Sequence, residues 1–116
     1  MRNDKENIIV DKSFQFALGV VLYCELLEEN KKFVVSRQLL RSGTSIGANV
    51  REAQNAESKA DFIHKIKLAA KEADETEYWL LICKNTPGYP FNDQLLKEVQ
   101  ELLKILSKIL SSSKSY

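Results

Sequence analysis

The chain is short of the residues that indicate disulfide staples, metal sites or broken helices. It holds two cysteines, two prolines, four glycines and one histidine in 116 residues. Cys24 and Cys83 lie in apolar stretches, so we expect buried, reduced thiols in a cytoplasmic protein. His64 alone cannot supply the two Glu-x-x-His motifs that a metal site in a bundle core needs. The sequence therefore predicts no metal and no cofactor.

Long apolar runs and an excess of one charge are also missing. The longest uninterrupted apolar run, residues 17–24, is far below the roughly 18 residues that a membrane helix needs. The first seven residues carry both signs of charge and lack the apolar centre of a signal peptide. The 17 basic and 16 acidic residues give a net charge of +1, which is not the balance of an autonomous nucleic-acid binder. We expect a soluble chain with no membrane partner.

Apolar residues at helical spacing are abundant, and they predict an all-α, up-down-up-down antiparallel four-helix bundle in one domain. The helices are expected at about residues 12–29, 36–55, 59–85 and 92–110, followed by a flexible tail at 111–116. Ser36, Ser58 and Asn92 are the expected N-caps, and the Thr-Pro-Gly-Tyr-Pro run at 86–90 separates the last two helices.

The last two segments carry apolar seams that step by four and three residues, which is the spacing of a helix that packs along a neighbour. In the third segment the seam is Phe62, Ile66, Ala69, Ala73, Thr76, Leu80 and Cys83. In the fourth it is Leu95, Val99, Leu102, Leu106 and Ile109.

The first segment differs because it carries two apolar faces. One face is Phe14, Ala17, Leu18, Val21 and Cys24, and the other is Phe16, Val20, Tyr23 and Leu27. A helix of a monomeric bundle needs one such stripe, so the second predicts association. Leu22, Tyr23 and Trp79 are the candidate interface residues, and Tyr78, Trp79 and Ile82 could supply the complementary surface.

Small residues interrupt the second segment at 42–48, where each glycine costs about 0.8–1 kcal/mol relative to alanine. Either the helix breaks there, or Gly43 and Gly47 permit another helix to come close. The short loop after this segment makes the second and third helices antiparallel, which places 42–48 opposite 67–73. The same register predicts that Arg41 reaches Glu72 or Glu75. Asn49 is expected to be partly buried and hydrogen-bonded.

Four carboxylates gather at residues 72–77 of the third segment. They could form an acid/base pair or a cation site, but Glu72 and Glu75 have structural partners in the predicted register. No elbow-like glycine motif flanks any serine, and no phosphate loop is present. We therefore predict no enzymatic activity. The alternative is a helical-bundle enzyme that acts on nucleic acid through Glu72, Glu75 and His64.

Basic residues also gather in places. The candidate nucleic-acid contacts are Arg37, Arg41, Arg51, Lys65, Lys67 and Lys71. Phosphate binding needs such residues to converge on one face, whereas the interleaved acidic residues favour an ordinary solvated surface.

Two long motifs carry a family resemblance: residues 39–53, with the run Leu-Leu-Arg-Ser-Gly-Thr-Ser-Ile-Gly-Ala-Asn-Val-Arg-Glu-Ala, and residues 58–80, from Ser-Lys-Ala-Asp-Phe-Ile to Lys-Glu-Ala-Asp-Glu-Thr-Glu-Tyr-Trp-Leu. They resemble the bacterial four-helix-bundle proteins encoded within intervening sequences of large-subunit ribosomal RNA genes, a group also labelled a ribosomal protein family. The resemblance covers essentially the whole chain.

This resemblance implies a closed bundle that assembles as a homopentamer and has no established enzymatic activity. It also implies kinship with the accessory variability protein of diversity-generating retroelements, a pentameric barrel that uses basic surface for nucleic acid and reverse transcriptase. The balanced charge of this chain departs from that relative. The leading hypothesis is a non-enzymatic assembly module that associates with RNA or a ribonucleoprotein.

Overall fold

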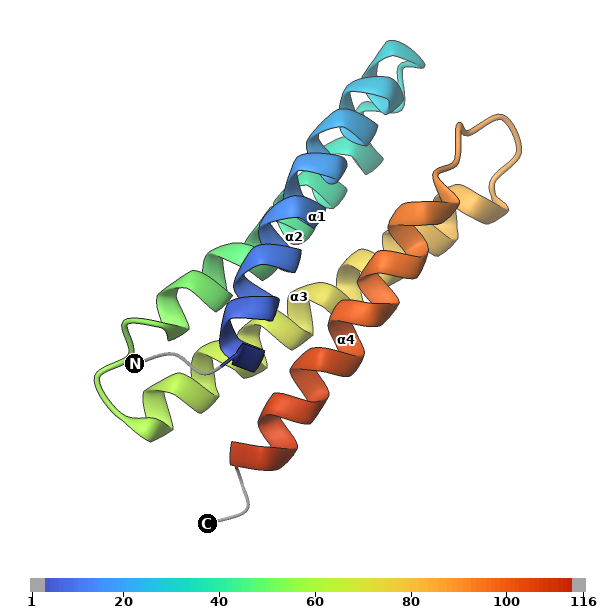
Figure 1. Ribbon diagram of the computed structural model, residues 1–116. Coiled ribbons are helices and arrows are strands. Elements are labelled where there is room, and N and C mark those ends of the chain that lie inside the picture. The colour runs from blue at the N-terminus through green and yellow to red at the C-terminus, as the bar shows by residue number, and fades with distance from the viewer. Residues whose placement is uncertain (1–3, 114–116) are drawn as a thin grey trace.

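The computed structural model describes residues 4–113, with side chains from residue 8 onward, as four helices in one antiparallel bundle (Figure 1). The helices are α1 (Asp4–Glu29), α2 (Phe33–Ala53), α3 (Lys59–Asn85) and α4 (Asp93–Ser113). Each helix packs against its two neighbours around the bundle, so α1 and α3 occupy diagonal corners, as do α2 and α4. The bundle measures 48 × 20 × 20 Å. The predicted fold class is confirmed.

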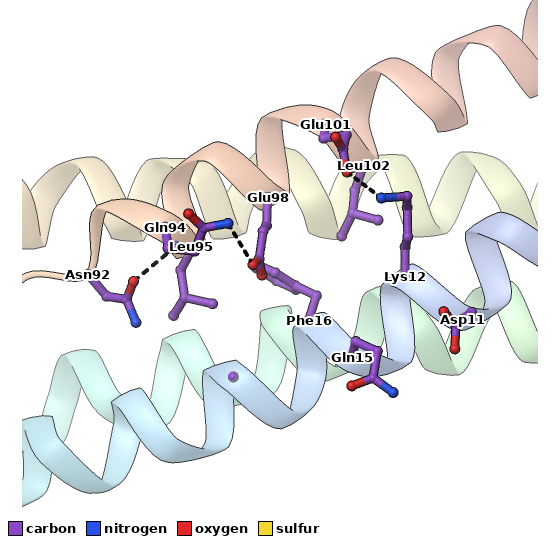
Figure 2. A pocket seen from close by; sticks show the side chains of 11 residues that line it. Asp11, Lys12, Gln15, Phe16, Asn92, Gln94, Leu95, Glu98, Glu101 and Leu102 are labelled. Carbon is purple, nitrogen blue, oxygen red and sulfur yellow. Dashed lines mark hydrogen bonds and ion pairs between the residues drawn. The ribbon is translucent and has the colours of Figure 1, made fainter.

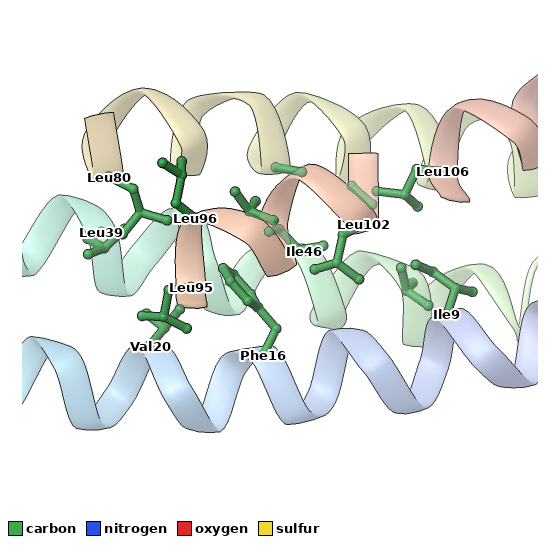
Figure 3. Packing of buried hydrophobic residues seen from close by; sticks show 14 of the residues in the cluster. Ile9, Phe16, Val20, Leu39, Ile46, Leu80, Leu95, Leu96, Leu102 and Leu106 are labelled. Carbon is green, nitrogen blue, oxygen red and sulfur yellow. The ribbon is translucent and has the colours of Figure 1, made fainter. Parts of the chain in front are cut away.

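The core runs along the bundle axis and draws on all four helices (Figure 3). Phe16, Leu39, Leu80 and Leu102 are each at most 1% exposed. Every predicted seam residue of α3 and α4 is buried, except Phe62, which is half-buried. Phe16 and Val20 of α1 project toward Leu95 and Leu102 of α4 in the middle of this core.

Two of the three predicted N-caps are present. The Ser58 hydroxyl accepts a hydrogen bond from the Asp61 amide at 3.0 Å, and the Asn92 side-chain oxygen accepts one from the Leu95 amide at 3.1 Å. The expected cap at Ser36 is wrong, because α2 begins at Phe33 and Ser36 lies buried in its second turn.

The turn between α1 and α2 explains this error. Lys31 has a positive φ of 63°, and the Lys32 amide donates back to the Leu27 carbonyl at 2.8 Å. This is the Schellman arrangement that ends a helix, with a lysine where glycine is usual. Because the turn needs only residues 30–32, α2 starts earlier than the sequence suggested. The Ser36 hydroxyl instead donates to the Cys24 carbonyl and to Glu28.

Other helix ends also differ from expectation. α1 begins at Asp4 rather than near residue 12, and Ile9 in the added turns is fully buried in the core. α2 ends at Ala53, two residues before the expected 55. α4 continues to Ser113, so residues 111–113 of the expected flexible tail are helical, while 114–116 lie outside the described residues. Within residues 4–113, no helix is long and apolar enough to cross a membrane.

Candidate functional site

The small-residue segment of α2 is a close-packing surface, and its partner is α1. A Cβ atom added to Gly43 would lie 2.9 Å from two carbons of Val20, and one on Gly47 would lie 3.3 Å from the Ser13 carbonyl oxygen. The expectation that these glycines face α3 is wrong. Since successive residues turn by about 100° around a helix, positions 43 and 47 share the α1 side, whereas Arg41 and Ser42 reach α3.

A charged cluster joins α2 to α3, as the antiparallel register predicted. Arg41 Nη1 lies 3.2 Å from Glu72 Oε1, and Arg41 Nη2 also pairs with Glu75. The indole nitrogen of Trp79 donates to Glu75 Oε2 at 3.0 Å. The guanidinium and the indole together lower the pKa of Glu75. Asn49 is half-buried and donates to the Ser45 carbonyl at 2.9 Å.

This geometry gives no support to a catalytic centre built from Glu72, Glu75 and His64. At 1.5 Å rise per residue, His64 lies about 12 Å from Glu72 and about 16 Å from Glu75 along α3. His64 is exposed, and both carboxylates are engaged by Arg41. Among the described residues, no group of three or more histidine, cysteine or acidic side chains could hold a metal ion.

Two of the six candidate nucleic-acid contacts are engaged by acidic side chains, and the other four are exposed. Arg41 is paired as above, and Lys65 Nζ lies 2.9 Å from Glu52 Oε1. Arg37 and Arg51 are exposed on α2, separated by 14 residues or about 21 Å of helix. Lys67 and Lys71 are exposed one turn apart on α3. The tertiary structure thus neutralises two of these cations.

The outer face of α1 carries several exposed apolar side chains. We use this name for Phe14, Leu18, Val21, Leu22 and Leu26, which are 54, 47, 38, 68 and 40% exposed. The opposite stripe, with Phe16 and Val20, is buried. The two apolar stripes found in the sequence therefore have different fates, because the chain itself covers only one of them.

The three candidate interface residues are placed differently. Leu22 is 68% exposed and lies on the outer face of α1, and Trp79 is half-buried beside Glu75. Tyr23 is a correction: it is only 3% exposed, and its hydroxyl donates to the Pro90 carbonyl at 2.6 Å. Its position on the Phe16–Val20–Leu27 stripe directs it into the core, so it cannot contribute a free surface.

Two grooves flank the outer face of α1. The α1–α2 groove is mostly apolar, encloses about 250 Å³, and is lined by Val10, Phe14, Ala17, Thr44, Gly47, Ala48 and Arg51. The α1–α4 groove is larger, about 650 Å³ (Figure 2). Its floor includes Phe16, Gly19, Leu95 and Leu102, and its rim carries Asp11, Lys12, Gln15, Asn92, Gln94, Glu98 and Glu101.

The rim of the α1–α4 groove is acidic. Lys12 Nζ lies 2.8 Å from Glu101 Oε1, which leaves Asp11 and Glu98 without a cationic partner among the described residues. The Gln94 amide donates to Glu98 at 3.0 Å (Figure 2). Sequence reasoning missed this groove, because its rim combines residues from opposite ends of the chain. The only available signal was the double apolar face of residues 12–29.

The two cysteines are free and buried, in keeping with the expected reduced thiols. Burial raises the pKa of Cys24 to about 11 and also raises the pKa of Cys83. Cys24 Sγ donates to the Ser36 carbonyl at 3.4 Å. Neither thiol has the low pKa that marks a nucleophilic cysteine, so both are core residues.

Two comparisons with known proteins give matches. The family model described as 23S rRNA-intervening sequence protein matches residues 5–112. A crystal structure of a protein of unknown function of the S23 ribosomal protein family, from Bacteroides thetaiotaomicron, is 49% identical, with a TM-score of 0.85 over 92% of this chain and 98% of that one. A search among curated proteins gives no match. With one family model spanning nearly all of its four helices, the chain belongs to the 23S rRNA-intervening sequence protein family.

Proposed function

We propose that this protein is a non-enzymatic assembly module that functions as a homo-oligomer. The observation that carries the proposal is the outer face of α1, where Phe14, Leu18 and Leu22 are each close to half exposed or more in the single chain. Contiguous exposed apolar surface of this kind marks an interaction site in soluble proteins. A ring of five is the form that the family resemblance implies.

Sedimentation equilibrium at micromolar concentration tests the proposal. We expect a species several times heavier than the 13.3 kDa chain. Leu18→Glu should shift the protein toward the single chain, because a carboxylate cannot be buried in an apolar contact without a partner. Gln38→Glu is the matched control, since it places the same charge on an exposed position of α2 outside this face. A clean 13.3 kDa species for the natural sequence contradicts self-association.

The second part of the proposal is association with RNA or a ribonucleoprotein. Its support is the family to which the chain belongs, together with exposed cations that have no acidic partner among the described residues, such as Arg37 and Arg51. The test is purification without nuclease, followed by sequencing of the nucleic acid that co-elutes. Loss of that nucleic acid with rising salt would be expected of phosphate contacts. A preparation free of nucleic acid at low salt contradicts this part.

The enzymatic alternative acts on nucleic acid through Glu72, Glu75 and His64. The separation of about 16 Å along α3 between His64 and Glu75 argues against it, as does the engagement of Glu75 by Arg41. Unchanged nuclease activity in a His64→Ala preparation would show that any activity present does not depend on His64.

A further inference from the structure

We propose that copies of this chain join head to tail, with the outward ridge of α3 of one copy seated in the α1–α4 groove of the next. The α3 ridge is defined by Lys67, Lys71, Asp74, Tyr78 and Leu81. This inference rests on the self-association proposed above and specifies the two surfaces that meet.

The α3 ridge has two chemically distinct ends. Lys67 and Lys71 are exposed, one turn apart, and have no acidic partner among the described residues. About two to three turns beyond Lys71, Tyr78 is 61% exposed and Leu81 is 39% exposed. The ridge therefore offers two positive charges toward the start of α3, one negative charge at Asp74 in its middle, and apolar surface toward its end.

The α1–α4 groove is likewise charged toward the start of its helix, α1, and apolar toward the end of that helix. Asp11 and Glu98 give its rim unpaired negative charge, and Asp11 lies in the early part of α1. Toward the end of α1 lies a second hollow, lined by Leu22, Tyr23, Leu26 and Phe91 together with Gly19, Asn92 and Asp93. The two hollows share Gly19 and Asn92, so they are adjacent. Along α1, the acidic rim is thus followed by a largely apolar hollow. Along α3, the lysines of the ridge are followed by Tyr78 in the same direction.

The spacings of the two surfaces agree. Asp11 and Leu22 are eleven residues apart on α1, and Lys67 and Tyr78 are eleven residues apart on α3. At 1.5 Å per residue, each interval spans about 16 Å along the helix. A parallel alignment of the two helices therefore brings the charged ends together at the same time as the apolar ends.

The levels of these residues within one chain agree to within several residues. Thr76 of α3 donates to Ser42 of α2 at 2.9 Å, and the next residue of α2, Gly43, packs on Val20 of α1. Contacts through α2 therefore place Val20 near the level of Thr76, whereas the α4 contacts Lys12–Glu101 and Gln100–Glu77 shift α3 by several residues relative to α1. Because α1 and α3 both run antiparallel to α2, they run in the same direction, and the difference in residue number between level positions stays constant. The difference between Val20 and Thr76 therefore places Leu22 near the level of Tyr78.

The offset that relates Leu22 to Tyr78 also places Asp11 level with Lys67 and Gln15 level with Lys71. In a ring whose symmetry axis follows the bundle axis, all copies stand at one height. The α3 ridge then meets a neighbour's α1 within a few residues of these levels.

Charge selects the α1–α4 groove over the α1–α2 groove. The α1–α2 groove carries Arg51, and it has no acidic residue in its lining. By the same level rule, Arg51 would approach Lys67 of an incoming ridge, and like charges placed together disfavour docking. The α1–α4 groove instead presents Asp11 at that level.

The two surfaces also point in directions that suit a closed ring. α1 and α3 occupy diagonal corners, but the groove lies on the α4 side of α1. Glu77 accepts from Gln100 of α4, so Lys67, Asp74 and Leu81, which share its side of the helix, lean toward α4 as well. The two contact surfaces are therefore not diametrically opposed, and contacts of this kind close into a ring when the rotation between copies is suitable.

Charge exchange tests this docking. Lys67→Glu with Lys71→Glu should weaken association by about tenfold or more at low salt, because the reversed charges face Asp11 and Glu98. Adding Asp11→Lys and Glu98→Lys to the same chain should restore assembly. Lys31→Glu with Arg37→Glu, at the other end of the bundle, is the matched control and should have no effect. Circular dichroism of every variant checks that the helices are intact.

Cysteine pairs give an independent test. A chain with both Leu22→Cys and Tyr78→Cys should form a ladder of cross-linked species under mild oxidation, up to the full ring. Either variant alone should form none, since a head-to-tail contact pairs position 22 with position 78. Cross-linked dimers from a single variant would overturn the model, and so would an assembled double variant without cross-links.

These outcomes separate the two proposals. If the natural sequence sediments as 13.3 kDa, self-association itself fails. If it assembles but neither charge exchange nor the cysteine pair has its expected effect, only this docking mode fails.

Discussion

The two faces of α1 have nearly the same amino-acid chemistry and opposite environments. Phe16 and Val20 on the inner face are at most 1% exposed, whereas Phe14 and Leu18 on the outer face are about half exposed. All four lie within the same seven-residue stretch of helix. The comparison shows that an apolar face favours burial on either side of the helix. The arrangement of the neighbouring helices decides whether side chains of the same chain cover that face.

The largest expected effect comes from a matched pair on these two faces. Phe16→Ala should lower the free energy of unfolding by about 3–5 kcal/mol, because it removes a core ring and leaves a cavity. Phe14→Ala should change the stability of the single chain by less than about 1 kcal/mol, since its ring is 54% exposed. Urea unfolding of both variants at a concentration that dissociates the oligomer measures the contrast. Equal losses would mean that the outer face is covered within the chain.

A second prediction concerns how closely α1 approaches α2. Gly43→Leu should cost about 1–3 kcal/mol or more, because even its Cβ would lie 2.9 Å from Val20. Gln38→Leu, an exposed change on the same helix, should stay within about 0.5 kcal/mol. Thermal melting compares the two variants. An unaltered melting temperature for Gly43→Leu would show that the helices do not need this close contact.

The reactivity of the Cys24 thiol tests where the exposed outer face of α1 ends. Cys24 belongs to the same sequence stripe as Phe14 and Leu18 but is buried against α2. Because its pKa is raised from 9.0 to about 11, its thiolate fraction at pH 8 is roughly 100-fold lower than that of an ordinary thiol. An aromatic disulfide reagent should therefore react slowly with the native protein and rapidly in denaturant. Fast labelling of the native Cys24 would place it on the exposed face.

The smallest effect is expected from the charged contact between α2 and α3. Arg41 lowers the pKa of Glu75, so this carboxylate stabilises the fold above its ordinary pKa of 4.5, and the contribution is lost as pH falls through the lowered value. Both side chains are more than a third exposed, and solvent screening limits the contribution to about 1 kcal/mol or less. Glu75→Gln should reduce the difference in stability between pH 7 and pH 3, while Asp74→Asn should not.

The helices and their inward faces could be read from the sequence because they depend on local periodicity. The seam of α3 from Ile66 to Cys83 matches the buried residues position by position, and its bounds at Lys59–Asn85 agree with the expectation. The start of α2 was misjudged, since a lysine with positive φ replaced the glycine that usually marks a helix end. The side on which Gly43 packs was misjudged because spacing alone does not say which of two neighbours a residue faces.

By itself, the sequence determined four helices, their antiparallel order, the inward stripes and the Arg41–Glu72 register, because each follows from residue spacing along one helix or across one short loop. Only the tertiary structure decided which face of α1 stays exposed, and which cations keep a free charge. It also decided that Asp11 and Glu98 meet at the rim of a single groove. Such properties depend on distances between segments that are remote in the chain, and these distances are set by the packing of all four helices together.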